Sequence, residues 1–593
     1  DASPRSRAYV GQTQVGAWPQ ALGHEEFLFT SRQKPRQSMA FPSSVRTERP
    51  DPPPGPLRDS GVPALAAIVL LAHLTLLPRI AGLDSFYHIG HTAHYLESGL
   101  TATAFPWATQ SVVMDLGADL WWGFHILLLP FALASTPPQA IHFAAPILTL
   151  VLAGTVVWVL RRHAVRHAGW WAVVLFLAVP NVLYRFLMVR PHVLSLAAAL
   201  LLLSFLVRGR WWQIAAAAAA LVWIHLGLFW MPLGMACAYG LSSLRRRPGR
   251  VALALGAVLA GTATGWVLRP NPMGAAGLAW TQIVRLFSEK ATEQPLLFAG
   301  ELLPLPVADL LRSAPLFAAL WLGGVTVWLA RLRRPEKRLP DDPGVSDAPA
   351  DRTFPTTALL ISAAFLAVTL LSARRALVEW VFFGALALPF IWEALGAATR
   401  LRGAGDAASG SPVAASRRTR AVIIGMVLIL GVHLAWAAQR HRLNTRLVAF
   451  PPDVLSGASR WLAARAEPGD TVFHLHWDNF GPLFAWNRSQ RYIGGMDPIF
   501  QYAHSPRRYW EYFFLSADLT TEWTCDAFPC YEGTATDTYT AIRRNFGARW
   551  VVIEPQRNPK LLSFLRTAPG FTLAVDTGRE IVFRVADDAP EGP

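Results

Sequence analysis

Long apolar stretches separated by short arginine clusters are the feature that most limits how this sequence can fold. Hydrophobic residues make up 53% of the 593 residues and charged residues only 16%, a composition typical of polytopic membrane proteins rather than soluble ones. Because about 20 consecutive apolar residues cross a bilayer as a helix, we predict a polytopic α-helical membrane protein with about 11 spans, at residues 62–82, 139–160, 169–187, 191–207, 211–225, 226–244, 250–268, 313–331, 355–372, 376–398 and 421–438.

The arginine clusters predict how these spans are oriented. They fall at residues 161–162, 208–210, 245–247, 331–338 and 400–420. Basic loops stay on the cytoplasmic side, and all five clusters share that side only if the apolar stretch 120–134 lies in or dips into the outer interface. The loops 83–138 and 269–312 then lie outside. If 120–134 crosses instead, the clusters fall on both sides. The net charge of +15 is divided among these runs, so we expect no nucleic-acid partner.

Three regions follow from changes in composition along the chain. Residues 1–60 are rich in Pro, Ser and Arg and are predicted to be a disordered cytoplasmic segment; we expect translation to start at Met39. Residues 61–439 form the membrane domain. From 440 to 593 strands alternate with helices, which predicts an extracytoplasmic α/β domain. Its strands are expected at 471–475, 550–553, 571–576 and 580–585, and its helices at 454–466, 539–546 and 559–567.

The first outer loop opens with Asp84-Ser85-Phe86-Tyr87-His88. With helical spacing, Asp84, His88, His91 and Tyr95 share one face. A carboxylate and two imidazoles converging at a membrane surface can take up a proton, hold a metal or bind a sugar. An interfacial amphipathic helix with its polar side in water explains the same pattern, and both interpretations stay open.

Further polar groups gather at the outer ends of the predicted spans. Glu301 stands in an apolar setting, where an unpaired carboxylate is costly and usually has a partner, a metal or a proton-transfer role. Guanidinium groups at this level could hold the phosphate of a lipid carrier or reach the lipid headgroups. These basic and imidazole side chains are Arg185, Arg190, His192, His225, Arg269, Arg374 and Arg375.

The C-terminal region carries two polar segments at strand ends, where α/β domains place ligands. They are His474-Leu475-His476-Trp477-Asp478 and Gly494-Gly495-Met496-Asp497. A turn with a capping Asp and structural glycines is the alternative. Three cysteines are too few for a disulfide framework, but Cys525 and Cys530 bracket a turn and could pair in an oxidising compartment.

Taken together, the motifs resemble the C-type superfamily of membrane glycosyltransferases, which use polyprenyl-phosphate sugars. Asp84 to His88, followed by Glu97-Ser98-Gly99 and Phe105-Pro106-Trp107, is similar to the first-loop pattern of the oligosaccharyltransferase catalytic subunit. A late Trp-Asp pair, here Trp477-Asp478, also matches. Four further segments resemble bacterial members of the superfamily: Trp223-Ile224-His225, Asn271-Pro272-Met273-Gly274, Gly300-Glu301 and Ala373-Arg374-Arg375. The chain departs from the pattern in having no Asp-x-Asp motif in an outer loop and in continuing Trp477-Asp478 with Asn479-Phe480-Gly481.

This resemblance implies an inverting transfer from a polyprenyl phosphate or diphosphate sugar to a lipid, glycan or protein acceptor on the extracytoplasmic face. Asp84 would be the general base or a metal ligand, and Glu301 would support the metal or the acceptor. Mg²⁺ or Mn²⁺ suits such oxygen ligands, with His88 or His91 contributing to Mn²⁺. The implied substrate-binding residues are His88, His91, Tyr95, Arg190, His192, His225, Arg269, Arg374, Arg375, Trp477 and Asp478, with Arg374 and Arg375 neutralising the departing phosphate.

Two other classes of protein stay open. A transporter or flippase would also place charges near its spans, but should have broken helices or inverted repeats, and neither is evident in the sequence. A noncatalytic envelope scaffold could use its external domain for binding. The Ala-, Arg- and Pro-rich composition is typical of a high-GC bacterium, so we expect a multi-pass protein of the bacterial inner membrane, surrounded by lipid, with a cytoplasmic N-terminus and a periplasmic C-terminal domain.

Overall fold

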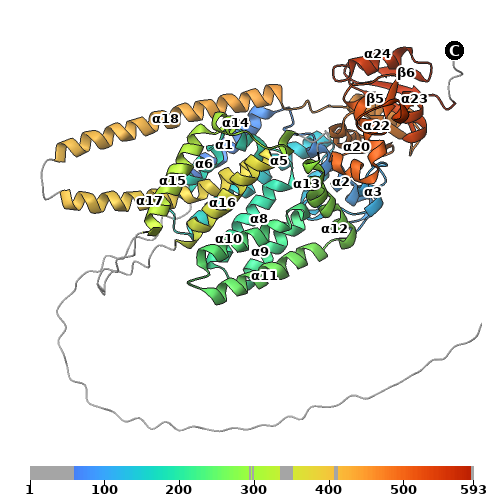
Figure 1. The fold of residues 1–593 in the computed structure, drawn as a ribbon. Helices are drawn as coiled ribbons and strands as arrows, with labels where there is room; N and C mark the ends of the chain where they lie inside the picture. Colours follow the sequence, from blue (N-terminus) through green and yellow to red (C-terminus); the bar gives the residue numbers. More distant parts are fainter. Residues whose placement is uncertain (1–58, 293–295, 297–299, 334–351, 407–411, 589–593) are drawn as a thin grey trace, which may run out of the picture. The chain divides into compact units, whose positions relative to one another are not determined.

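The computed structural model describes residues 59–292, 296, 300–333, 352–406 and 412–588. It is mostly helical, and a sheet-containing region follows the apolar helices (Figure 1). This confirms the predicted class of polytopic helical protein in its coarse form. Apart from Asp59 and Ser60, the segment predicted to be disordered, 1–60, lies outside the described residues.

Six helical segments are long and apolar enough to cross a membrane. A seventh is added if a bent pair of helices counts as one span, so the predicted number of about 11 is not confirmed within the described residues. Helices α1 (Gly61–Leu76), α9 (Trp211–Ile224) and α10 (Trp230–Ser243) are shorter, with 16, 14 and 14 residues. The six segments are α5 (Pro137–Arg162), α8 (Pro191–Arg208), α11 (Pro248–Val267), α15 (Pro315–Arg333), α16 (Thr353–Leu371) and Arg374–Glu393, which covers the start of α17 (Leu377–Asp406).

One predicted span is broken in the structure, and another lies in a helix that is only partly described. The stretch 169–187, predicted as one helix, is broken into α6 (Ala168–Leu177) and α7 (Pro180–Phe186), which are bent by 98°. Pro180 lacks an N–H group and therefore starts a new helix rather than continuing the old one. The predicted span 421–438 lies in α18 (Pro412–Leu447), where several side chains fall outside the described residues.

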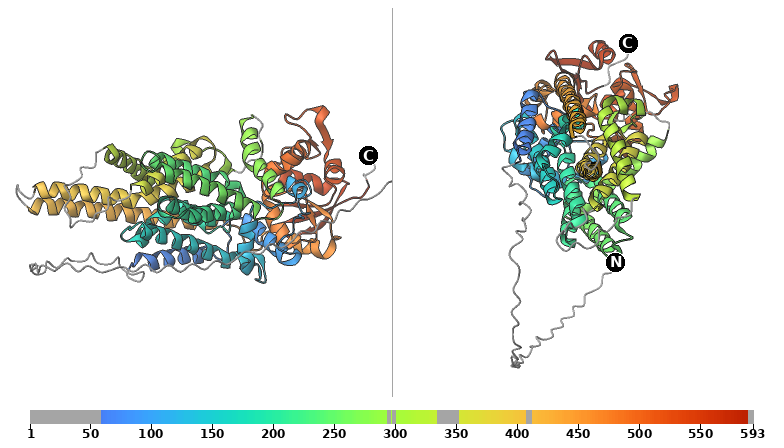
Figure 2. Two further views of the ribbon diagram at one scale, coloured as in Figure 1. Left: turned by 90° about the horizontal axis from the view of Figure 1, so that it is seen from below. Right: turned by 90° about the vertical axis from the view of Figure 1, so that its left-hand side faces the viewer.

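Small residues allow the central helices to pack closely. Helices α8, α9, α10 and α11 lie side by side (Figure 1, Figure 2). A Cβ atom on Gly261 or Gly265 of α11 would stand 2.2 Å from the carbonyl oxygen of Ala215 or 2.3 Å from that of Ala219, both in α9. The glycines, spaced four residues apart, thus let the two backbones touch, as in other membrane helix pairs.

The first loop contains α2 (Asp84–Ser98), α3 (Val112–Leu116) and α4 (Trp122–Ala132). Helix α4 lies in the stretch 120–134 and has only 11 residues, about 16 Å at 1.5 Å per residue, which is too short to cross a bilayer. The segment between α2 and α3 joins the sheet region. Tyr492 N–H donates to the Trp107 carbonyl over 2.7 Å, and the Trp107 indole donates to the Arg488 carbonyl over 2.7 Å.

The C-terminal region is built on a five-stranded mixed sheet. Strand β1 is parallel to both β2 and β5, whereas β7 is antiparallel to β5 and β6. All four predicted strands form within about two residues of their expected ends, because their buried apolar residues fit a pleated strand. Helix α18 continues to Leu447, past the predicted domain boundary at 440. The sheet order is β2 (Arg491–Tyr492), β1 (Thr471–His474), β5 (Ala548–Ile553), β7 (Ile581–Val585) and β6 (Phe571–Asp576).

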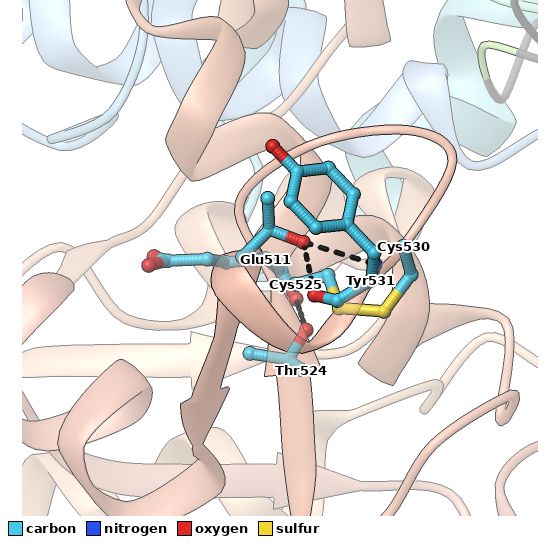
Figure 3. The surroundings of a disulfide bond; sticks show 6 residues. Glu511, Thr524, Cys525, Cys530 and Tyr531 are labelled. Carbon is cyan, nitrogen blue, oxygen red and sulfur yellow. Dashed lines mark hydrogen bonds between the residues drawn. A yellow bond between two sulfur atoms is a disulfide. The ribbon is translucent and has the colours of Figure 1, made fainter.

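A small hairpin is attached to this sheet region. Its two strands were not predicted from the sequence, whereas a bond between its two cysteines was named there as possible. Strands β3 (Trp523–Cys525) and β4 (Ala535–Asp537) pair antiparallel. Cys525 and Cys530 form a disulfide with their Cα atoms 5.6 Å apart, and the Thr524 hydroxyl donates to the Glu511 carbonyl over 2.6 Å (Figure 3). The remaining helices are α12 (Pro272–Trp280), α13 (Leu286–Ala291), α14 (Val307–Ser313), α19 (Ser456–Arg465), α20 (Phe480–Trp486), α21 (Pro498–His504), α22 (Pro506–Ser516), α23 (Thr538–Thr540) and α24 (Pro559–Thr567).

Candidate functional site

A cavity of about 670 Å³ is lined by the ends of several apolar helices, by the loops between them and by the sheet region. Many of the predicted site residues contribute to its wall, although they are far apart in the sequence. Those that line it are Asp84, His88, Arg190, His192, His225, Glu301, Arg375, Trp477 and Asp478.

Four charged side chains in this wall form one arginine–carboxylate cluster: Asp84, Arg185, Arg190 and Glu301. Arg190 bridges the two carboxylates, with Nη2 2.7 Å from Asp84 Oδ2 and Nη1 3.5 Å from Glu301 Oε1. Arg185 Nη2 lies 3.3 Å from Glu301 Oε2. The four side chains remain 21–36% exposed, so a ligand in the cavity can reach them.

Local backbone structure positions each member of the cluster. Arg190 precedes Pro191 and has extended φ and ψ angles of −135° and 151°, as expected for a residue before proline. Asp84 is the first residue of α2. Glu301 lies in a 3₁₀ turn (Gly300–Leu302) that is tied to the start of α17, because Arg374 N–H donates to the Leu303 carbonyl over 2.8 Å.

The two carboxyl groups of the cluster differ in their acidity. For Glu301, burial acts to raise the pKa, but Arg190, Arg185 and Arg375 outweigh it and lower the pKa to about 2. For Asp84, burial raises the pKa and the opposing effect of Arg190 does not cancel it. Glu301 is therefore a fixed anion, whereas Asp84 takes up a proton more readily than a free Asp.

Several nitrogen atoms beside the cavity are buried without a hydrogen-bond partner in the described part of the chain. They are Arg185 Nε, Arg190 Nε and His192 Nε2. Leaving a buried donor unsatisfied costs roughly 1–3 kcal/mol, so native structures seldom do so unless water or a ligand completes the bonding. Together with Arg375, they favour an anionic ligand in this cavity.

A second cluster of polar side chains, the histidine network, joins α2 to the rest of the first loop. It consists of Tyr87, His88, His91, Tyr95, Asp119 and His125. Asp119 Oδ2 is 2.6 Å from His125 Nδ1 and accepts a 3.0 Å hydrogen bond from Tyr95 OH. His125 Nε2 is 2.9 Å from His88 Nδ1, and Tyr87 OH is 2.8 Å from His91 Nδ1. The four residues predicted to share one polar face of α2 therefore belong to two different surroundings. Asp84 and His88 line the large cavity, whereas His91 and Tyr95 do not.

The network contains a group whose ligand atoms are close enough to hold a metal. His91, Asp119 and His125 each offer one such atom within 4.8 Å of the others. However, Asp119 already accepts hydrogen bonds, and the His91 and His125 rings stack with centroids 4.5 Å apart and planes at 22°. Nearly parallel rings do not direct their nitrogen lone pairs to one point, so the geometry favours a hydrogen-bonded network.

The predicted metal ligands Asp84 and Glu301 are also arranged differently from a cation site. The Arg190 guanidinium lies between them, in the place that a bound cation would need, and Arg185 adds a second positive charge. These residues do not fit a metal in this arrangement. Their metal-binding role stays a prediction from the sequence.

Two of the predicted arginines lie away from the cavity wall. Arg269 is buried, and its guanidinium donates to backbone carbonyls, including those of Val222 over 2.7 Å and Asp119 over 3.2 Å. These bonds tie α9 to the first loop. Arg374 is exposed and donates to the Pro304 carbonyl over 3.4 Å, whereas its neighbour Arg375 lines the cavity.

Asp497 and Gln282 are polar residues of the cavity wall that were not among the predicted site residues. Asp497 follows the glycine pair Gly494-Gly495, which was noted in the sequence only as a possible ligand loop. Gln282 lies in a π-helical turn (Thr281–Arg285) inside the second loop. Nothing in the sequence around Gln282 marks it, since a π-helical turn has no simple residue pattern.

Neither a protein-family model nor a curated protein sequence matches this chain. Solved structures do match. The apo oligosaccharyltransferase of Archaeoglobus fulgidus is 11% identical, with a TM-score of 0.46 over 88% of this chain and 74% of that one. ArnT from Cupriavidus metallidurans is 15% identical in two structures. The apo form has a TM-score of 0.48 over 89% of this chain and 99% of that one. The form bound to undecaprenyl phosphate has 0.49 over 90% and 99%.

Proposed function

We propose that this protein transfers a sugar or oligosaccharide from a polyprenyl-phosphate or diphosphate carrier to an acceptor on the extracytoplasmic face, with inversion at the anomeric carbon. One observation carries the proposal. A single cavity at the ends of apolar helices brings together Arg185, Arg190 and Arg375 with the carboxylate of Asp84. Positive charge for a leaving phosphate and a carboxylate for the acceptor are the two requirements of such a transfer.

The arginines form the donor side of the proposed site. Guanidinium forks match phosphate oxygens, and Arg185 and Arg190 each keep a buried Nε without a partner among the described residues. Apolar side chains that include Leu228, Phe287 and Phe365 line the same cavity and suit the first isoprene units of a lipid carrier. As the bond from the anomeric carbon to the phosphate breaks, the arginines stabilise the growing negative charge, an effect worth about 10²–10³ in rate for one well-placed donor.

The acceptor side is formed by Asp84 and by the sheet region. The acceptor hydroxyl must lose its proton as its oxygen bonds to the anomeric carbon, and a carboxylate in the cavity can receive that proton. Asp84 faces the cavity, is held by Arg190 over 2.7 Å and would orient the acceptor hydroxyl for this proton transfer. Trp477 and Asp478 border the cavity from a 3₁₀ turn (Trp477–Asn479), with Asp478 paired to Arg557 over 3.3 Å. They would contact the acceptor.

Placement of this site outside the cytoplasm has two supports. The predicted orientation puts the arginine clusters 161–162, 208–210 and 245–247 on the cytoplasmic side. The disulfide between Cys525 and Cys530 belongs to an oxidising compartment such as the bacterial periplasm. We propose a bacterial inner-membrane protein whose sheet region is periplasmic.

A transporter or flippase is the second candidate, because one span is broken. Helices α6 and α7 meet at 98°, and α7 carries Arg185 of the cluster. Broken helices frame the binding sites of many transporters. A transporter would move a lipid-linked anion without breaking a bond to it.

Replacing Asp84 by Asn separates these functions. In a deletion strain we expect a lipid-linked sugar to accumulate, detected by lipidomics. With that lipid as donor, reconstituted D84N should transfer about 10²-fold more slowly than wild type, because the acceptor loses the group that orients it, while still binding polyprenyl phosphate. Asp309→Asn is the matched control, because Asp309 pairs with Arg312 on an exposed surface.

Two outcomes would favour another function. If wild type and D84N both move the lipid across vesicles without transferring its sugar, the protein is a transporter. If the envelope glycans of the deletion strain are unchanged, the result favours a scaffold.

A further inference from the structure

Asp497 is a second carboxylate that the sheet region contributes to the cavity wall. It is the N-cap residue of α21, yet its side chain makes no capping hydrogen bond to that helix. Asp in this position normally accepts from the backbone of the next turn. Instead, the Gln282 side chain in the second loop acts on the carboxylate as a hydrogen-bond partner that lowers its pKa.

The loop that carries Asp497 is held in one unusual shape. Met496 has a φ of +70°, a conformation that costs energy for a residue other than glycine and that persists mainly at functional sites. A Cβ atom on Gly495 would stand 2.1 Å from the Phe480 ring, so no other residue fits there. His474 Nε2 lies 2.9 Å from the Gly494 carbonyl oxygen. The position of Asp497 is therefore fixed from both the strand and the helix beside it.

Gln282 is closely packed in the second loop. It is buried and lies in the π-helical turn Thr281–Arg285, a feature often found at functional sites. A Cβ atom on Gly227 would stand 2.5 Å from Gln282 Oε1, so the absence of a side chain there makes room for the amide. Gly227 follows His225, which lines the same cavity.

Charges on every side set the acidity of Asp497. Arg375 and Arg190 face it with positive charge, and Glu301 and Asp84 with negative charge. Burial is the largest effect and raises the pKa of Asp497, as do the two carboxylates. Arg375 and the hydrogen-bonding Gln282 side chain lower it. The resulting pKa of Asp497 is about 7. A general base works best with a pKa near the working pH. Asp84, by contrast, is held in a direct ion pair with Arg190.

We infer that Asp497 is the catalytic base of the proposed transfer and that Gln282 is its positioning residue. This inference rests on the proposed function. The Asp497 carboxylate takes the proton from the acceptor hydroxyl, whose oxygen forms the bond to the anomeric carbon. The bond from that carbon to the phosphate oxygen breaks, and its electron pair leaves on the polyprenyl phosphate beside the arginines. Asp497 then releases its proton to water, while Arg190 stays on the donor side and Asp84, which it holds, orients the acceptor hydroxyl.

The test measures kcat against pH in the reconstituted full chain, with the lipid-linked sugar that accumulates in the deletion strain as donor. Wild type should gain rate as pH rises through about 7, because only the ionised form of Asp497 accepts a proton. Asp497→Asn should lower kcat about 10²–10⁴-fold with little change in KM for the donor. Gln282→Leu should move the rising limb to higher pH, because it removes a hydrogen bond to the ionised form.

Asp453→Asn is the matched control, since Asp453 pairs with Arg579 on an exposed surface of the same region, and it should leave kcat and its pH dependence unchanged. If wild type and D497N are both active and D497N keeps the rise of kcat with pH, the inference is overturned. The proposed function then still stands. If D497N does not fold, an unshifted limb in Q282L overturns the inference instead. A wild type without transfer, and a deletion strain without accumulated lipid-linked sugar, would refute the proposed function itself.

Discussion

The arginine–carboxylate cluster and the histidine network both include residues of α2, yet they differ in how completely their polar atoms are bonded. In the cluster, Asp84 and Glu301 keep 36% and 31% of their side-chain surface exposed, and buried nitrogens of both arginines have no partner in the described part of the chain. In the network, Asp119 is only 7% exposed and His125 is fully buried. An incompletely bonded group is available to a ligand, whereas a saturated one holds the fold together.

Asp84 of the cluster and Asp119 of the network also differ in acidity. Burial alone would raise the pKa of Asp119, but His125, His91 and hydrogen bonds from His125 and the Trp121 N–H hold it below its usual range. The pKa of Asp84 is raised instead. The cluster carboxylate therefore takes up a proton more readily than a free Asp, while the network carboxylate stays an acceptor of hydrogen bonds.

Arg190→Gln should produce the largest effect if the cluster is the donor site. The substitution removes the bridge between Asp84 and Glu301 and one guanidinium from the leaving phosphate. We expect the transfer rate to fall about 10²–10³-fold, measured with the lipid-linked donor under single-turnover conditions, with a smaller change in thermal stability. Arg374→Gln is the matched control, because Arg374 is exposed and bonds only a backbone carbonyl in the described structure. Equal losses in both variants would contradict the distinction between Arg190, which lines the cavity, and Arg374, which does not.

Asp119→Asn should affect stability more than catalysis. Asn keeps the shape but cannot accept a charge-assisted bond from His125, and it leaves buried donors poorly satisfied. We expect a loss of roughly 1–3 kcal/mol in unfolding free energy, seen as a lower thermal midpoint in detergent, with donor binding retained. A divalent metal that copurifies with wild type and is lost in D119N would contradict this assignment, since it would make His91, Asp119 and His125 a metal site.

The fold was predictable from the sequence where local patterns determine it. The apolar runs indicated α5, α8, α11, α15 and α16, and the alternating C-terminal pattern indicated β1, β5, β6 and β7. The number of spans was not predicted correctly in the described residues, because short apolar runs such as 211–225 were counted as spans. That run forms α9, whose 14 residues are fewer than the roughly 20 that cross a bilayer. The break at Pro180 was missed as well, since a proline inside a long apolar run is compatible with either a kink or a new helix.

The candidate site was predictable in residue type but not in pairing. Spacing placed Asp84 and His91 on one face of a helix, but only the packing of α4 against α2 separates the cavity from the network. Arg269 and Arg190 looked alike in the sequence. In the structure Arg269 is bonded to backbone carbonyls and Arg190 to carboxylates. Pairings across more than a hundred residues depend on tertiary structure, which no local pattern encodes.

Glu301→Gln gives the smallest expected effect and examines the cluster through its pH dependence. The pKa of Glu301 is lowered to about 2 in the folded protein, below the usual value near 4.3 for an unfolded chain. The ionised form therefore favours folding above the unfolded pKa, and this contribution is lost as pH falls toward 2. For a partly exposed pair we expect a difference of about 1 kcal/mol or less between wild type and E301Q. Thermal midpoints in detergent should differ by a constant amount between about pH 7 and pH 5 and converge below pH 4. A difference that does not change with pH would mean that Arg185 and Arg190 do not stabilise the Glu301 anion, and the cluster would then lack the fixed negative charge that holds its arginines in place.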